Sequence, residues 1–221
     1  MPTRARERLL DAAEDLFYAE GIRAVGVERI LSVSGVGRAS FYRHFPSKDD
    51  LVVAVLRRRD ERWRAWLAER VEALGGHPLD VFDALAERFA RADFRGCAFI
   101  NTMIETADPD SAAHRVAAEH KERVRAYVSG LIERDGRADA AELAHLFVLL
   151  VDGAIVTAVR ERSPHPALRA RAAATALLAT TETTTGAATN AAATRDAATG
   201  EGAATKRAAM REAAAAGPRR G

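Results

Sequence analysis

The sequence predicts an all-α protein of about nine helices, and three observations support this fold class. Apolar residues recur at helical spacing along most of the chain, as Leu9, Ala13, Leu16 and Phe17 do near its start. Stretches rich in glycine, proline and aspartate separate these segments, and no alternating strand pattern of useful length is present. The chain has 221 residues, of which 48% are hydrophobic, so it is long enough to bury a core.

Recognisable start and stop signals bound the expected helices. Ser47, followed by Asp49 and Asp50, forms a start that resembles a capping box for a long fourth helix, and Pro46 ends the third. Gly21 and Gly35 suit the ends of the first and second helices. The expected helices cover residues 3–19, 27–33, 38–44, 48–74, 79–92, 97–106, 110–135, 138–162 and 166–179.

Charge, cysteine content and hydropathy exclude several classes of protein. The formal net charge is only +2, so any contact with nucleic acid must come from local clustering of cations. Cys97 is the only cysteine, which excludes an intrachain disulfide and fits the reducing cytoplasm. We expect no membrane partner, because no run of about eighteen apolar residues is present, and no secretory signal, because the first residues are charged.

Composition divides the chain into three expected regions. Residues 1–50 hold three short helices, and residues 51–179 hold the remaining six. Leu, Ile, Val and Phe all end at Leu178, and residues 180–221 are mainly Ala, Thr and Gly with scattered charge. Such a segment buries too little apolar surface to offset its ordering entropy, so we expect a disordered tail.

The segment "GVGRASFYRHFPSKDDL" predicts a helix-turn-helix. Gly35 suits the positive φ that ends a helix, and Val36 suits a buried position in the angle between two helices. Phe41 and Phe45 are four residues apart, so they share the face of the third helix that we assign to the core. This arrangement leaves the opposite face of a short helix exposed.

That outer face carries Arg38, Ser40, Tyr42, Arg43 and His44, which suit contacts with phosphate oxygens and base edges in a major groove. The alternative for His44 is simple packing against the first helix, and for Tyr42 an ordinary surface position. A metal site at His44 is disfavoured because no second ligand stands three or four residues away. The basic run at residues 57–64 is interpreted as a solvated helix face rather than a DNA contact.

Residues 6–56 resemble the TetR family of transcriptional regulators. The positions that match the family pattern are Phe17, Gly21, Ile30, Gly35, Val36, Phe41, Tyr42, His44, Phe45, Lys48 and Leu51. The resemblance implies double-stranded DNA as a partner, with phosphate contacts from Tyr42, His44 and Lys48. It also implies that Arg38, Ala39, Ser40 and Arg43 lie near the bases, and Val27 and Glu28 at the edge of the groove.

Three positions depart from the family pattern. Gly26 and Gly37 stand where a hydroxyl residue often caps the second and third helices, and Leu31 replaces a small alanine. Glycine is acceptable at these caps but weaker than serine, so the departures bear on the contacts of the two helix starts rather than on the fold.

The resemblance further implies that residues 51–179 bind a small-molecule effector and form a homodimer through the last two helices. An effector pocket needs apolar walls with few polar groups. The candidate ligand-binding residues are Trp63, Trp66, Phe82, Phe89, Phe99, Asn101, Met103, His114, Tyr127, His145, Phe147 and Asp152. Asp152 has two interpretations, as a ligand or interface contact or as a structurally paired carboxylate. Cys97 is interpreted as a buried residue, with a redox sensor as the alternative.

These features predict a homodimeric, ligand-responsive repressor that binds a palindromic operator. The alternative keeps the fold but drops the effector, which gives a structural or constitutive DNA-binding factor. An all-α enzyme is disfavoured, because the sequence shows no pairing of nucleophile and base, no metal-spaced cluster and no paired catalytic carboxylates. No cofactor is expected.

Overall fold

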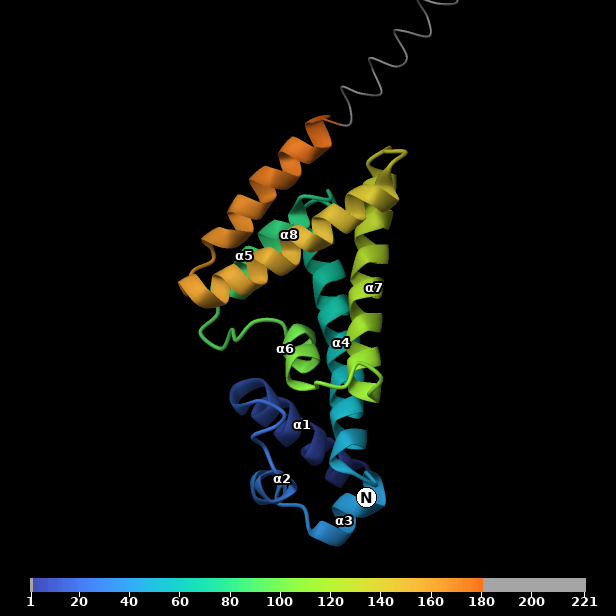
Figure 1. Cartoon of the computed structure of the whole chain (residues 1–221), viewed down its shortest axis with the longest axis vertical. Coiled ribbons are helices and arrows are strands. Elements are labelled where there is room, and N and C mark those ends of the chain that lie inside the picture. Colours follow the sequence, from blue (N-terminus) through green and yellow to red (C-terminus); the bar gives the residue numbers. More distant parts are fainter. Residues whose placement is uncertain (1, 181–221) are drawn as a thin grey trace, which may run out of the picture. The chain divides into compact units, whose positions relative to one another are not determined.

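The computed structural model describes residues 2–180, and all regular elements in that range are helices (Figure 1). Eight of them are α1 (Pro2–Glu20), α2 (Val27–Ser34), α3 (Arg38–His44), α4 (Lys48–Leu74), α5 (Asp80–Phe89), α6 (Ala98–Glu105), α7 (Ala112–Arg134) and α8 (Ala140–Glu161). Residues 165–180 form a ninth helix within the described range. Residues 1–175 make one compact unit, and residues 176–180 belong to a second unit.

The all-α prediction is confirmed, and most helix ends lie within two residues of the expected ones. The largest difference is at α5, which ends at Phe89 instead of residue 92. Arg91 and Ala92 are good helix formers, but they belong to the segment RADFRG that breaks the helix, and the chain already turns there, with the Phe94 amide donating to the Arg91 carbonyl at 3.1 Å. The tail expected at residues 180–221 lies outside the described residues except for Thr180.

The helices of the first unit extend from a three-helix end to an end that holds α5 and α8 (Figure 1). α1 packs against α2, α3 and α4, and α4 continues from the three-helix end along α7. α7 also packs against α6 and, more extensively, against α8. α4 and α7 therefore run between the two ends of the unit.

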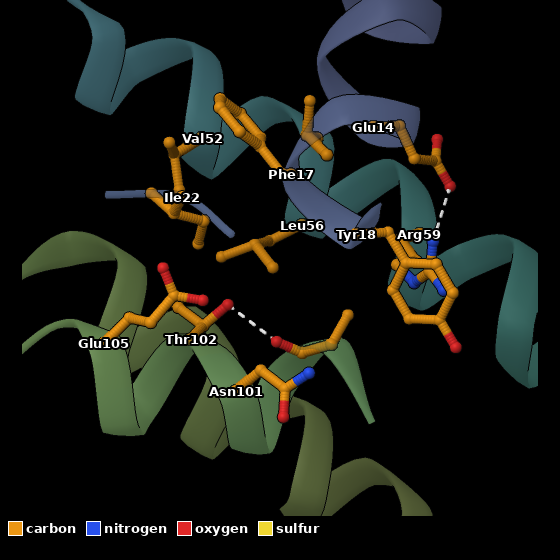
Figure 2. A pocket seen from close by; sticks show the side chains of 12 residues that line it. Glu14, Phe17, Tyr18, Ile22, Val52, Leu56, Arg59, Asn101, Thr102 and Glu105 are labelled. Atoms are coloured by element: carbon orange, nitrogen blue, oxygen red, sulfur yellow. Dashed lines mark hydrogen bonds and ion pairs between the residues drawn. The ribbon is translucent and has the colours of Figure 1, made fainter. Parts of the chain in front are cut away.

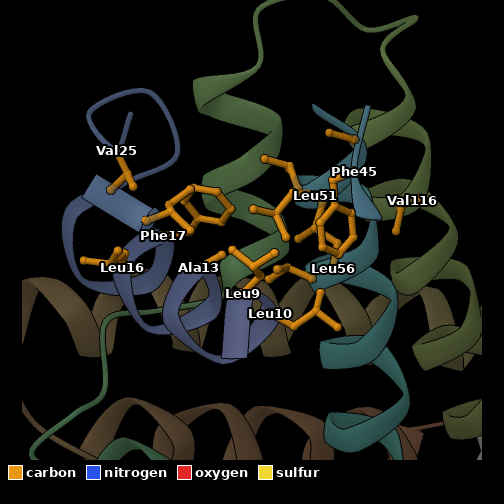
Figure 3. Packing of buried hydrophobic residues seen from close by; sticks show 14 of the residues in the cluster. Leu9, Leu10, Ala13, Leu16, Phe17, Val25, Phe45, Leu51, Leu56 and Val116 are labelled. Atoms are coloured by element: carbon orange, nitrogen blue, oxygen red, sulfur yellow. The ribbon is translucent and has the colours of Figure 1, made fainter. Parts of the chain in front are cut away.

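One hydrophobic cluster joins the first three helices to the rest of the unit (Figure 3). It contains Leu9 and Phe17 from α1, Leu51 and Leu56 from α4, and Val116 from α7, all of them buried. The division at residue 50 that the sequence suggested thus crosses a shared core. The boundary between the two regions stays a prediction about folding units.

A buried carboxylate links α4 to α7. Asp60 is 1% exposed, and its Oδ1 lies 2.8 Å from Nδ1 of His120, which is 2% exposed. Arg64 donates to both carboxylate oxygens at 3.0 Å, and Arg123 donates to Oδ2 at 2.8 Å. The ring of His120 stacks on Phe99 with a centroid separation of 3.6 Å. A buried charge is tolerated only when it is paired in this way.

The titration of this pair is strongly shifted. Burial lowers the pKa of His120 from 6.5 to about 4, although the hydrogen bond to Asp60 opposes the shift. Burial raises the pKa of Asp60, but the hydrogen bonds from Arg64, His120 and Arg123 outweigh it, so the pKa lies below its usual value. Neutral His120 and ionised Asp60 are thus the stable forms at neutral pH.

α8 is long and apolar enough to cross a membrane by length and composition alone, which the sequence analysis did not anticipate. In the structure one side of α8 packs on α7 and α5, and Phe147, Val151 and Ala154 are buried there. Of the apolar window of α8, 39% is buried within the unit, and helices that pack in the core of a globular unit pass the same test.

The turn between α2 and α3 predicts opposite effects for its two glycines. Gly35 has φ +62°, so Gly35→Ala should destabilise the protein by roughly 1 kcal/mol, because a side chain is strained in this conformation. Gly37 has φ −70°, and no atom lies within 4 Å of the place where its Cβ would be. Gly37→Ser should therefore stabilise by about 0.5 kcal/mol through a new N-cap.

Urea unfolding at neutral pH measures both changes. A Gly35→Ala variant as stable as the wild type would contradict the left-handed conformation, and a destabilised Gly37→Ser variant would contradict the open N-cap.

The Asp60–His120 pair predicts a loss of stability on acidification. Because the pKa of His120 is lower in the folded than in the unfolded chain, the unfolded chain takes up a proton first as the pH falls. Stability should drop by roughly 3 kcal/mol between about pH 6.5 and pH 4. The contribution of Asp60, whose folded pKa is lowered, is lost only below the unfolded value of 3.8.

Chemical unfolding at a series of pH values tests this, with His120→Gln as the variant and His145→Gln, at an exposed position, as its control. His120→Gln should flatten the pH dependence in this window, and His145→Gln should keep it. Equal slopes for both variants would refute the assignment.

Candidate nucleic-acid interface and internal cavity

The turn between α2 and α3 has the geometry expected for a helix-turn-helix. Gly35 ends α2 in the left-handed conformation and donates its amide to the Leu31 carbonyl at 3.0 Å. Val36 is 5% exposed and belongs to the hydrophobic cluster, as do Phe41 and Phe45. The prediction that these three side chains anchor the motif in the core is confirmed. α3 is therefore held by one face, and its other face is open.

The open face presents the side chains that the sequence predicted. Tyr42 is 47% exposed, and Arg43 is exposed and donates to the Ser40 hydroxyl at 3.0 Å. Arg38 is exposed and forms an ion pair with Glu28 of α2. Ala39 is exposed, and Val27, at the start of α2, is half-buried. The structure thus brings the predicted residues of α2 and α3 to one surface, which we call the reading face.

His44 and Lys48 are less accessible than the other predicted DNA contacts. His44 is half-buried, and its Nε2 is shielded from solvent with no hydrogen-bond partner among the described residues. A phosphate contact would therefore have to use Nδ1. Lys48 donates to the Ile22 carbonyl at 2.6 Å, so its ammonium group fastens the loop before α2 to the start of α4. Two of its three N–H donors remain for other acceptors.

The basic run at residues 57–64 is only in part the solvated face that the sequence suggested, because Arg57 and Arg62 are exposed whereas Arg58 and Arg59 are not. The side chains of Arg58 and Arg59 are 13% and 16% exposed. Arg58 donates to Glu14 of α1 at 2.7 Å, and Arg59 lies 3.3 Å from the same carboxylate. Sequence patterns show charge but not its partner on another helix, which is why the ion pairs were missed. These arginines attach α1 to α4.

An internal cavity with a volume of about 40 Å³ lies between α4, α5, α6, α7 and α8, and Tyr18 of α1 reaches it. The lining residues are Tyr18, Arg59, Trp63, Leu85, Arg88, Phe89, Phe94, Gly96, Cys97, Ala98, Phe99, His120, Lys121, Val124, Val151 and Ile155. We refer to it as the aromatic cavity. Apolar walls with a few polar groups are typical of small-molecule sites.

Three of the predicted ligand-binding residues, Trp63, Phe89 and Phe99, line the aromatic cavity. Phe82 and Phe147 lie elsewhere. They contact each other with ring centroids 5.5 Å apart and have no exposed surface, so they fill the core between α5 and α8. Periodicity places all these rings on inward faces but does not distinguish a cavity wall from a filled core.

Other predicted ligand contacts are also placed outside the aromatic cavity. Asn101 donates to the Arg95 carbonyl at 3.3 Å and lines a smaller cavity of about 30 Å³. Met103 packs against the hydrophobic cluster, and His145 is exposed on α8. His114 has a buried Nδ1 without a hydrogen-bond partner among the described residues.

The last three predicted contacts lie beside the cavity or on a groove. Trp66 contacts Trp63 with ring centroids 6.3 Å apart. Tyr127 lines a groove over α4 and α7, and burial raises the pKa of its phenol. Asp152 pairs with Lys121 at 2.5 Å, so the interpretation as a paired carboxylate agrees with the structure, although the pair stands at the cavity wall.

Several cavity residues escaped the sequence analysis. They are Tyr18, Arg59, Arg88, Phe94, His120 and Lys121. A signal existed for His120, because it stands midway in the row of Val116 and Val124 and therefore faces inward on α7. Its partner, Asp60, is sixty residues away, and no local pattern reveals such a pair.

Tyr18 connects the three-helix end to the aromatic cavity. Its hydroxyl donates to the Gly96 carbonyl at 3.0 Å and accepts from the Arg95 amide at 2.8 Å. The guanidinium of Arg59 lies over its ring, 4.1 Å from the centroid. Tyr18 and Arg59 line the smaller cavity as well, and Figure 2 shows them beside Glu14. A change in the loop before α6 therefore alters the hydrogen bonds of α1 directly.

A second contact with α1–α2 comes from the end of α6. The Glu105 carboxylate accepts the Arg23 amide at 3.0 Å and lies against Gly21, where an added Cβ would approach its oxygen to 3.1 Å. α6 thus touches both the cavity, through Phe99, and the loop that leads to α2. Figure 2 shows Glu105 facing the α1 side of the smaller cavity.

Comparison with known proteins agrees with this geometry. Residues 9–55 match the family model described as bacterial regulatory proteins of the tetR family. Residues 79–174 match the model described as the C-terminal domain of LmrA/YxaF-like transcriptional regulators. The first match spans α2 and α3, and the second spans α5 to α8.

Proteins that resemble the whole unit are also known. SCO4454, a TetR-family transcriptional regulator from Streptomyces coelicolor, is 32% identical with a TM-score of 0.69, over 78% of this chain and 94% of that one. A TetR-type regulator from Streptomyces avermitilis is 32% identical with a TM-score of 0.71, over 80% and 98% of the two chains. The transcriptional repressor ComR of Escherichia coli is 27% identical over 166 residues, which are 69% of this chain and 79% of ComR.

The two family models together include α2, α3 and most helices around the aromatic cavity. The two solved relatives match this chain over most of their length. The chain therefore belongs to the TetR family of transcriptional regulators and carries the DNA-binding helix-turn-helix of that family.

Proposed function

We propose that the protein is a homodimeric repressor that binds a palindromic operator and is released by a small effector in the aromatic cavity. The observation that carries the proposal is Tyr18, because this one side chain belongs to α1 and also lines the cavity. An effector can shift the protein only by binding one conformation better than another. A residue shared by the cavity and α1 gives the effector a direct contact with the helix that packs against α2 and α3. DNA as the partner also implies the cytoplasm as the location.

The exposure of the residues on the reading face supports two kinds of DNA contact. Tyr42 and Arg43 have the exposure and the donors to reach phosphates or base edges. Lys48 and His44 sit at the margin, where they suit backbone contacts that fix the register. Arg38 is paired with Glu28, so its contact with a base would require that surface ion pair to open, at little cost in free energy.

An exposed apolar face supports the proposed dimer. Leu149, Val156 and Val159 are 69%, 57% and 46% exposed on α8, and Leu168 of the following helix is 48% exposed. The first two are seven residues apart, so they share one side of α8. We propose that a second copy of the chain covers this face. Twofold symmetry would then present two reading faces to the two halves of a palindrome.

The small volume of the cavity, about 40 Å³, favours the alternative of a constitutive DNA-binding factor without an effector. The two hypotheses differ in one measurement. An effector-responsive protein should be stabilised thermally by at least one compound of a metabolite library, because a ligand of the folded state raises its stability. A library without any stabilising compound would favour the constitutive factor.

The reading face predicts that Arg43→Ala weakens operator binding by about ten-fold or more, because a charged contact to phosphate or base is lost. Fluorescence anisotropy with the operator selected by the wild-type protein from genomic fragments measures the affinity. The matched control is Arg70→Ala. Arg70 lies on the part of α4 that is distant from α3, and it pairs with Glu87 of α5. Equal affinities of the Arg43→Ala variant and the wild type would refute the assigned face.

The apolar face predicts that a Leu149→Glu/Val156→Glu double variant is monomeric, because four carboxylates would be buried in a symmetric interface. Analytical ultracentrifugation gives the oligomeric state, and operator affinity should fall with the loss of the dimer. Ile104→Glu is the control, since Ile104 is 75% exposed and lies on α6 rather than on α8. A double variant that stays dimeric would place the interface elsewhere.

A further inference from the structure

The aromatic cavity and a neighbouring groove carry an unusual set of charges. The cavity wall contains the cations Arg59, Arg88 and Lys121, and none of its lining residues is an aspartate or a glutamate. The groove has a volume of about 760 Å³ and is lined by Arg91, Arg95 and Arg162, again without an acidic residue. The lining of both spaces therefore contains basic side chains and no acidic one, although Arg91 is paired with Asp93 beside the groove.

Two aromatic rings border both spaces. Phe89 and Phe94 line both the cavity and the groove, and their centroids lie 4.8 Å apart. Phe89 is 6% exposed, whereas Phe94 is half-buried and stands in the loop between α5 and α6. Because Phe94 is held by a loop and not by a helix, it is the ring that a ligand entering from the groove would displace.

The cavity cations differ in how they are already paired. Arg59 pairs with Glu14, and Lys121 pairs with Asp152. Arg88, on α5, lines the cavity and makes no direct ion pair among the described residues, but its charge joins the hydrogen bond from Arg91 in lowering the pKa of Asp93. Arg88 is a half-buried residue of the cavity lining, so an anionic ligand in the cavity can bind its guanidinium through two parallel hydrogen bonds.

The remaining walls select for a flat ring. Trp63, Phe89, Phe94 and Phe99 supply four aromatic side chains, and aromatic pairs prefer stacked or edge-to-face contacts. A cationic ligand would meet Arg59, Arg88 and Lys121 without any acid in the lining. A neutral ligand would fill the same volume without pairing with the charge of Arg88.

We propose that the effector is a planar aromatic acid, whose carboxylate binds Arg88 and whose ring replaces Phe94 against the aromatic wall. The inference rests on the proposed function for the consequence of binding but not for binding itself. Displacing Phe94 moves the adjacent Arg95 and Gly96, which hold the Tyr18 hydroxyl. Entry of the acid thus disturbs the two hydrogen bonds that join the cavity loop to α1.

The test compares three probes that share a ring system and differ in charge. 2-Naphthoate, 2-naphthamide and 2-naphthylmethylamine are titrated into the full chain by isothermal titration calorimetry, and benzoate with benzamide serves as a smaller pair. The acids should bind at least about ten-fold more tightly than their amides, and the amine should not bind. Amides or the amine binding as tightly as the acids, or no binding by any acid, would overturn the proposal.

Variants locate the charge. Arg88→Gln should weaken the acids by about ten-fold and leave the amides unchanged, and Arg88→Lys should restore part of the affinity because it keeps the charge. Arg125→Gln is the control, since Arg125 pairs with Glu122 on the surface of α7. Equal losses in the Arg88→Gln and Arg125→Gln variants, or a loss for the amides as well, would refute the role of Arg88.

Operator binding is measured on the same preparations without any probe. If the wild type binds its operator but no acid, the ligand inference fails and the regulator function stands. If the acids bind as expected but no DNA is bound, the regulator function fails and the ligand inference stands. The two hypotheses are thereby separated.

Discussion

The hydrophobic cluster shared by α1, α4, α6 and α7 is the constraint on which the rest of the structure depends (Figure 3). It holds α1, α2 and α3 against α4, α6 and α7, so the first three helices share their core with helices of the aromatic cavity. Phe17 of α1 and Phe99 of α6 belong to the same cluster, and Phe99 also faces the cavity. A conformational change at the cavity can therefore displace α1 through a few packed side chains, because packed interiors transmit displacement.

Most of the fold was predictable because helices leave local signals. The αL glycine, the buried Val36 and the two phenylalanines of α3 follow from residues within about ten positions of each other. The pairing of Glu14 with Arg58 and of Asp60 with His120 was not predictable, because each joins helices far apart in the sequence. Charges without a visible local partner were interpreted as solvated, and the structure shows Arg58 to be largely buried.

The sequence predicted the residues of the reading face better than those of the cavity, because only the reading face is built from neighbouring residues. The reading face lies on two consecutive short helices, so family resemblance and helical spacing place its residues well. The cavity is assembled from six helices and a loop, and only Trp63, Phe89 and Phe99 of the predicted residues line it. Aromatic residues on inward faces, such as Phe82 and Phe147, look alike in sequence whether they bound a space or fill one.

The electrostatic interactions of this protein are of two kinds, buried ion pairs such as those of Glu14 and solvent-exposed side chains on the reading face. The pairs of Glu14 with Arg58 and Arg59 have side chains between 13% and 16% exposed, whereas Arg38 and Tyr42 face solvent. Dissolved ions screen charges in water far more than charges within the protein. Rising ionic strength should thus release α2 and α3 from DNA while the ion pairs between α1 and α4 persist. Dissociation from DNA by salt should therefore leave the fold intact.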